Sequence, residues 1–291
     1  MRIRSSSGGL LDLVLPKHLE GRVLLLLPAG AFLLVFFVYP LALLVSMSLG
    51  GTEGLGVYRR LVATPVYLKV MLNTFETAGT VTAICLLAAY PFSTLLTKVS
   101  SATRARMLFL TMLPLWTSLL VRNYAWLLLL ERKGAINYIL QWLGIIDHPL
   151  ELLYNQTSVV IGMVYVMLPF MILPLYSVMN GLDRTLLNAA ETLGATYLQI
   201  FLRVYLPLTL PGIAAGSILV FMLSLGFFIT PAMLGGPQQM MIAVRINTEA
   251  QQLLHWDVAS ALALMLLGST MVLFAVGVRW FGFGKIWEGL S

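Results

Sequence analysis

The chain has 291 residues, of which 59% are hydrophobic and only 10% are charged. An ordinary soluble domain carries roughly 25% charged residues, so this composition excludes a soluble globular protein and indicates one embedded in a membrane. The net charge of +6 does not indicate nucleic-acid binding, because the basic residues are scattered between long apolar runs and form no clustered patch.

Six segments are long and apolar enough to cross a bilayer, which takes roughly 20 residues of helix. In chain order they cover Leu24–Leu49, Val70–Thr97, Met107–Leu130, Val159–Asn180, Pro207–Thr230 and Val258–Val278. The first segment contains no charge and is longer than the apolar core of a signal peptide, so we expect a retained helix. The sequence therefore predicts an all-α, polytopic membrane protein with six transmembrane helices.

The basic residues that flank these spans are distributed unequally. Lysines and arginines next to spans tend to stay in the cytoplasm, and more of them fall on the side of the N-terminus. We therefore expect both termini to be cytoplasmic. The predicted organisation is a cytoplasmic N-terminal segment over residues 1–23, a transmembrane domain over 24–280 and a cytoplasmic tail over 281–291.

The polar stretch between the fourth and fifth spans, residues 181–207, carries the strongest signal in the chain. Apolar residues between Leu186 and Leu193 recur at helical spacing, Gly194 is a natural helix stop, and a second helical pattern leads to Pro207. This pattern predicts a helix, a glycine turn, a second helix and a fifth span that begins at the proline. An amphipathic helix resting on the membrane surface is the alternative interpretation.

The same stretch resembles the EAA loop of ABC importer permeases. The family pattern is Glu-Ala-Ala, three residues, Gly, nine residues, Ile, any residue and Leu-Pro. The positions that match are Ala189, Ala190, Gly194, Leu206 and Pro207. Asn188 replaces the family glutamate and Val204 replaces the isoleucine, while Glu191 offers a carboxylate on nearly the same helical face as Asn188.

In the family that this loop resembles, it forms a cytoplasmic coupling helix that sits in a groove on an ATPase. The resemblance implies an ATPase-coupling site made of Asn188, Ala189, Ala190, Glu191, Gly194, Ala195, Val204, Leu206 and Pro207. It implies three protein partners in a bacterial inner membrane: a cytoplasmic ABC ATPase dimer, a second homologous permease subunit and a periplasmic or extracellular solute-binding protein. ATP and Mg belong to the ATPase, because this chain has no GxxxxGK[ST] loop, and we expect it to bind no cofactor or metal.

Four further stretches resemble the spermidine/putrescine permease branch of this family. They are Leu113–Trp126, Gly134–Leu140, Phe228–Gly236 and Trp256–Ala263. This resemblance implies a polyamine such as putrescine or spermidine as the cargo. Another small solute carried within the same branch is the alternative.

Charged residues inside a span are costly and usually face a cavity or a partner, which singles out Glu76 and Arg122. A cationic cargo would be lined by carboxylates and aromatic faces, so Tyr124, Trp126 and Asp257 are further candidates for the substrate pathway. Structural interpretations stand beside these: Glu76 and Arg122 snorkel or pair, the aromatic residues form an interfacial belt, and Asp257 caps the sixth span.

Two other classes of function fit the sequence less well. A secondary transporter driven by an ion gradient usually has paired internal repeats, and no clear duplication is visible. An intramembrane enzyme would be expected to carry a motif such as HExxH or GxSxG, neither of which occurs, and the three histidines fall outside the apolar segments. We therefore expect no catalytic residues.

Overall fold

The computed structural model describes residues 20–51 and 54–280. Every regular element within these two ranges is helical, which confirms the predicted all-α fold. Of the predicted terminal segments, residues 1–19 and all of 281–291 lie outside the described ranges. Five helical stretches are long and apolar enough to cross a membrane, and a sixth crossing results if two helices joined by a sharp bend count as one.

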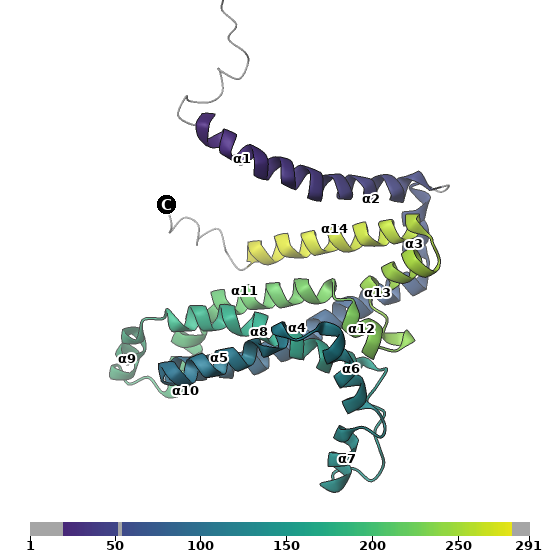
Figure 1. Cartoon of the computed structure of the whole chain (residues 1–291). Helices are drawn as coiled ribbons and strands as arrows, with labels where there is room; N and C mark the ends of the chain where they lie inside the picture. Colours follow the sequence, from purple (N-terminus) through teal and green to yellow (C-terminus); the bar gives the residue numbers. More distant parts are fainter. Residues whose placement is uncertain (1–19, 52–53, 281–291) are drawn as a thin grey trace, which may run out of the picture.

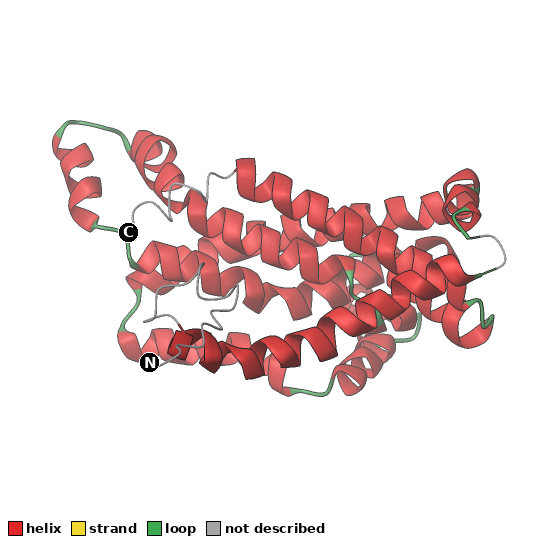
Figure 2. Ribbon diagram, turned by 90° about the horizontal axis from the view of Figure 1, so that it is seen from above, coloured by secondary structure: helices red, strands yellow, loops and turns green. Residues whose placement is uncertain are grey.

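The long helices run side by side, and the short helices gather mainly at the two ends of the molecule (Figures 1 and 2). The long elements are α1 (Glu20–Leu33), the π-helical η2 (Leu34–Val38), α2 (Tyr39–Gly50), α4 (Pro65–Lys98), α5 (Ser101–Trp116), α8 (Gln156–Asn180), α11 (Leu206–Leu225) and α14 (Trp256–Trp280). The short elements are α3 (Gly56–Ala63), α6 (Leu119–Leu130), α7 (Ala135–Trp142), α9 (Arg184–Thr192), α10 (Tyr197–Ile200), the π-helical η3 (Phe201–Tyr205), α12 (Ile229–Leu234), the 3-10 helical η4 (Pro237–Gln239), α13 (Ile242–Asn247) and the π-helical η5 (Thr248–Gln252). In Figure 1, α9 and α10 lie at the same end as the start of α1 and the end of α14, and α3, α12 and α13 lie at the opposite end.

The core of the molecule is formed by α4, α8 and α11, which pack against one another. Glycines on α11 allow this close approach: a Cβ on Gly216 would lie 2.8 Å from the sulfur of Met171, and one on Gly212 would lie 3.0 Å from Cβ of Val178. Small residues commonly have this role in membrane helices, where van der Waals packing is a main source of helix association. A side chain at either glycine would therefore push α11 away from α8.

The predicted third span, Met107–Leu130, is not one straight helix. α5 ends at Trp116, α6 begins at Leu119, and the two helical stretches are bent by 96°. The break follows from the extended backbone of Thr117, which has ψ of 146°, three residues after Pro114 has removed a backbone donor. As a result α6 and α7 project away from the bundle (Figure 1).

The predicted fifth span, Pro207–Thr230, is displaced along the chain. The helical run is continuous over Tyr197–Leu225, so Pro207 lies within it and does not begin it. Proline is tolerated there because it occupies the first turn of α11, directly after the wider π-helical turn of η3. The run ends before Gly226. The other spans, observed as Leu27–Gly50, Pro65–Lys98, Gln156–Asn180 and Trp256–Gly277, lie close to their predicted positions.

Candidate functional site

The first helix of the predicted coupling loop, α9, begins at a side-chain cap. The carboxylate of Asp183 accepts a hydrogen bond of 2.9 Å from the backbone N–H of Thr185. The hydrogen bonds from Thr185 hold the pKa of Asp183 below its ordinary value. The carboxylate is therefore ionised at neutral pH, and the dipole of the helix favours a negative charge at this end.

The same helix ends in a glycine turn. Gly194 has a φ of +81°, a left-handed conformation that glycine adopts at little cost. The N–H groups of Gly194 and Ala195 donate to the carbonyls of Glu191 and Ala190, at 2.9 and 3.1 Å. This pair of bonds is the Schellman motif, which satisfies the last carbonyls of a helix. Thr196 then caps α10, so the structure contains the helix, glycine turn and helix that the sequence indicates.

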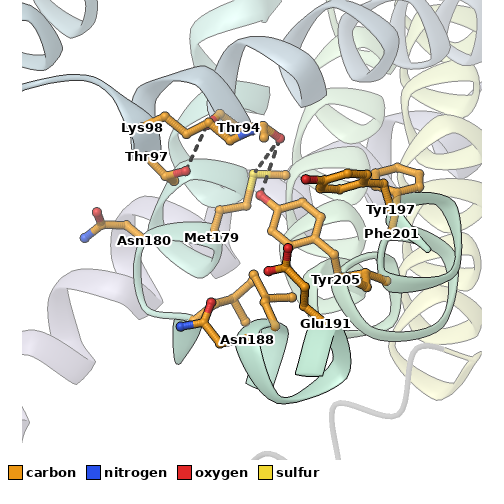
Figure 3. A pocket seen from close by; sticks show the side chains of 13 residues that line it. Thr94, Thr97, Lys98, Met179, Asn180, Asn188, Glu191, Tyr197, Phe201 and Tyr205 are labelled. Atoms are coloured by element: carbon orange, nitrogen blue, oxygen red, sulfur yellow. Dashed lines mark hydrogen bonds between the residues drawn. The ribbon is translucent and has the colours of Figure 1, made fainter. Parts of the chain in front are cut away.

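A cavity of about 380 Å³ lies between α9 and the ends of α4 and α8 (Figure 3). The wall on α4 carries hydroxyl groups and one amine, from Thr94, Thr97 and Lys98. The facing wall carries Asn188 and Glu191 from α9 and the aromatic rings of Phe201 and Tyr205 from η3. The hydroxyl of Tyr205 donates a 3.4 Å hydrogen bond to Oγ1 of Thr94, which links the two walls.

The two faces of the coupling loop differ in character. Asn188 and Glu191 line the cavity and Ala189 does not, although all three side chains are exposed. Beyond the helix, Leu193 is 89% exposed and Tyr197 is 85% exposed. Exposed apolar side chains of this size mark sites of contact with another protein or with a membrane. The loop therefore offers apolar contact area outside the helix bundle.

The remaining residues of the predicted coupling site lie where the loop joins the membrane helix. Val204 is half-buried in η3, and Leu206 and Pro207 form the first turn of α11. This junction is held to α4 by aromatic contacts, since the ring of Tyr90 lies 6.1 Å from Phe201 in an edge-to-face arrangement. These residues therefore belong to the base of the continuous helix, while residues 188–195 form the exposed part.

Two of the predicted pathway residues come together on one tyrosine ring. The guanidinium carbon of Arg122 lies 5.8 Å from the ring centroid of Tyr165, and Trp126 meets the same ring edge-on at 5.8 Å. Nε and Nη1 of Arg122 are buried and have no hydrogen-bond partner within the described part of the chain. Tyr124 is 61% exposed and stays apart from this group. The Tyr165 ring therefore already interacts with a cation of the protein itself.

The two predicted carboxylates of the pathway lie at separate places. Glu76 is exposed on α4, and no hydrogen bond or ion pair joins it to another described residue. The helix between Glu76 and Lys98 is roughly 33 Å long, so the two side chains lie far apart along α4. Asp257 lies in the first turn of α14 beside Gly51, where a Cβ would be 3.0 Å from its Oδ2.

A buried charged network was not predicted from the sequence. Its residues come from the chain segment that joins α11 to α14 and from α4. Glu249 is 1% exposed, and its carboxylate contacts Nη2 of Arg245 at 2.6 Å, the hydroxyl of Tyr67 at 2.9 Å and Nδ1 of His255 at 3.1 Å. Burial acts to lower the pKa of Arg245, but its contacts with Tyr67 and Glu249 raise that pKa overall. The spacing of four residues between Arg245 and Glu249 was the available signal. Across residues 20–51 and 54–280, no three His, Cys, Asp or Glu side chains are grouped to hold a metal ion.

Comparison with known proteins identifies the family. Residues 22–282 match the family described as "Binding-protein-dependent transport system inner membrane component". The chain belongs to this family. The spermidine/putrescine transport system permease protein PotB of Escherichia coli K12 is 39% identical over 209 residues, covering 72% of this chain and 76% of that protein. PotB of Haemophilus influenzae is 37% identical over 242 residues, covering 80% and 85%.

The fold is also found in a solved bacterial transporter. The structure of an alginate ABC transporter, in complex with an alginate pentasaccharide-bound periplasmic protein, has a chain that superposes with a TM-score of 0.74. The superposition covers 90% of this chain and 94% of that one, at 18% sequence identity, so the likeness concerns the fold. With the family match, it makes this chain the inner-membrane permease of an ABC importer and decides against a secondary transporter.

Proposed function

We propose that this chain forms half of the translocation pathway of an ATP-driven importer of polyamines such as spermidine and putrescine. The identity of the cargo is inferred from sequence similarity. The chain is 39% and 37% identical to two PotB proteins, which are named for spermidine and putrescine transport. A second, homologous permease subunit supplies the other half of the pathway. A solute-binding protein delivers the cargo and provides most of the selectivity.

In this proposal the surface of residues 188–195 docks on a cytoplasmic ATPase dimer, which holds ATP and Mg. The exposed side chains of Leu193 and Tyr197 support this role, because they offer apolar contact area. The small side chains of Ala189 and Ala190 allow the partner to approach closely. The chain itself carries no cofactor.

The same proposal fixes the orientation in the membrane. The start of α1 and the end of α14 lie at the same end of the molecule as α9 (Figure 1). If α9 contacts a cytoplasmic ATPase, both chain termini are cytoplasmic as well. The opposite end, with α3, α12 and α13, then faces the binding protein. The unequal distribution of basic residues supports this orientation.

The proposed transport cycle links these two ends of the molecule. A loaded binding protein docks on the outer end, and ATP binding closes the ATPase dimer. Closure moves α9, and the movement passes into the membrane through the continuous helix over Tyr197–Leu225. The permease pair turns outward to receive the cargo, and hydrolysis returns it to the inward state. The exposed carboxylate of Glu76 attracts the cationic cargo on its way in.

The deciding experiment reconstitutes the chain in liposomes with the second permease, the ATPase and the binding protein encoded beside it. We expect ATP hydrolysis and uptake to be stimulated by binding protein loaded with putrescine or spermidine. Stimulation by a different solute alone would change the cargo and keep the importer. Uptake by this chain without nucleotide would contradict the importer itself.

A variant pair tests the docking surface within the same system. Ala190→Asp places a charge at the close contact and is expected to abolish co-purification of the ATPase, with normal insertion into the membrane. Ala102→Asp is the matched control, because Ala102 is exposed at the start of α5 and lies outside residues 188–195. Equal ATPase recovery with both variants would remove the coupling role from this loop.

A further inference from the structure

The cavity beneath α9 has one charged side chain of each sign. Lys98 lies on the α4 wall and Glu191 on the α9 wall, with the cavity between them (Figure 3). Within the described residues, neither side chain forms an ion pair or a hydrogen bond. The two charges therefore face the same space and are available to a molecule that enters it.

The other residues that line the cavity also differ between its two walls. The α4 wall adds the hydroxyl-bearing Thr94 and Thr97 beside Lys98, and the facing wall adds the rings of Phe201 and Tyr205 beside Glu191. The hydroxyls of Thr94 and Thr97 already donate to the backbone carbonyls of Tyr90 and Thr94, so the ammonium of Lys98 supplies the donor for an anion on this wall. The carboxylate and the aromatic faces opposite attract a cation. One side of the cavity thus suits an anionic group and the other suits an ammonium group.

We propose that this cavity binds a small zwitterion, whose anionic group lies at Lys98 and whose ammonium group lies at Glu191. Its volume of about 380 Å³ falls in the range of small-molecule sites, roughly 300 to 1,000 Å³. A ligand with two ammonium groups would place one beside Lys98, and a ligand with two carboxylates would place one beside Glu191. Each would be disfavoured by repulsion between like charges, and an uncharged ligand would gain no charge-assisted hydrogen bond from either side chain.

Such a ligand would join a spanning helix to the coupling loop. It would contact α4 and α9 at once, so it would restrain the movement of α9 relative to the membrane domain. The effect on transport rests on the proposed function of α9 as the coupling helix, whereas the binding itself does not. The site is therefore a candidate for regulation of the importer by a cytosolic metabolite of amino-acid type.

Three probes with the same four-carbon chain separate the charge requirement from size. γ-Aminobutyrate carries one ammonium and one carboxylate, putrescine carries two ammonium groups, and succinate carries two carboxylates. Isothermal titration calorimetry on the full-length chain in lipid nanodiscs is expected to show γ-aminobutyrate binding at least tenfold more tightly than succinate. Putrescine binding, if it occurs at the pathway, is expected to be unchanged by substitutions at Lys98 and Glu191.

Substitutions locate the site. Lys98→Met and Glu191→Gln are each expected to weaken γ-aminobutyrate binding about tenfold, as loss of one charge-assisted hydrogen bond does. The double variant Lys98→Glu with Glu191→Lys is expected to regain binding, because the ligand can bind in the reverse orientation. Lys69→Met and Glu131→Gln remove the same charges from exposed positions outside the cavity and serve as controls.

Three results would overturn the proposal: no heat of binding with γ-aminobutyrate at tens of millimolar, equal binding of all three probes, or binding unaffected by both single variants. Size-exclusion profiles of each variant show whether the chain is still folded, and the double variant distinguishes lost charge pairing from lost structure. Binding with no effect on ATP hydrolysis in the assembled complex would keep the site and contradict only its link to coupling. Failure of polyamine-stimulated hydrolysis would leave the calorimetric result intact.

Discussion

The carboxylate of Asp183 caps the N-terminus of α9 and is expected to stabilise this helix. Because its pKa is lowered in the folded chain, its stabilising effect is fully present above the ordinary pKa of an aspartate. The effect is lost as the pH falls through the lowered value. We therefore expect the hydrogen-exchange protection of residues 184–187, corrected for intrinsic rates, to be constant from neutral pH to about pH 4.

Substitution of the same residue tests the cap directly. Asp183→Ala removes the acceptor for the backbone N–H of Thr185 and is expected to reduce the protection of residues 184–187 several-fold. Asp183→Asn keeps an acceptor at this position and is expected to retain most of the protection. Equal protection in the two variants would show that the hydrogen bond does not stabilise α9.

Glu76 is the residue for which the pathway proposal makes the sharpest prediction. Its carboxylate is exposed and has no described partner, so Glu76→Gln removes a charge without breaking an internal contact. We expect the KM for uptake of a polyamine to rise several-fold, with assembly of the complex unchanged. Glu131→Gln, at an exposed carboxylate after α6, is the control. Unchanged uptake kinetics for Glu76→Gln would make this residue a structural one.

At the scale of elements, substitutions at Gly194 test whether the glycine turn after α9 is needed for binding of the ATPase. Gly194→Ala places a Cβ at a φ of +81°, which costs roughly 1 kcal/mol, whereas Gly194→Asn is tolerated better in this conformation. We expect co-purification of the ATPase to decrease for Gly194→Ala and to stay close to normal for Gly194→Asn. Gly144→Ala introduces the same kind of strain at a φ of +66° after α7 and is expected to leave co-purification unchanged.

The buried network around Glu249 is expected to hold η5 against α4. Glu249→Gln leaves Arg245 without its charged partner, and loss of one partner from a buried ion pair costs roughly 3 kcal/mol. The midpoint of thermal unfolding, followed by tryptophan fluorescence, should therefore fall by several degrees. His255→Ala is expected to cost less, because that side chain is 60% exposed.

A double variant distinguishes the charge from the packing at the same site. Arg245→Met combined with Glu249→Leu removes both charges and is expected to recover most of the lost stability. Failure of this variant to recover would mean that the contacts with Tyr67 and His255, more than the ion pair, hold the network together.

The sequence predicted most elements of the fold because a membrane span requires a long apolar helix. It did not predict the bend after Trp116 or the continuation of the fifth helix through Pro207, since both depend on local backbone geometry that apolar length does not report. The helix, glycine turn and second helix after the fourth span were predictable from their spacing, whereas the coupling role of this loop stays a prediction. The contact between Tyr67 and Glu249 was not, because these residues are separated by 182 positions and only the fold brings them together.

At the scale of the whole molecule, the orientation is open to direct labelling. The test uses cysteines introduced at Leu193, which is 89% exposed just after α9, and at Trp142, which is 77% exposed on α7, a helix well away from α9 (Figure 1). A membrane-impermeant maleimide is expected to label position 142 in intact cells and position 193 only after permeabilisation. Cys85 is fully buried and should contribute little background. Labelling of position 193 from outside would reverse the proposed orientation.

The uninterrupted helix from Tyr197 to Leu225 has a mechanical consequence. It is roughly 43 Å long, so a tilt of about 10° about one end displaces the other by roughly 7 Å. If α9 docks on the ATPase as proposed, such a lever needs no relay of side-chain rearrangements, because one continuous helix carries the movement from the coupling loop into the bundle. Spin labels at its two ends would then move in concert during turnover, with their mutual distance held constant.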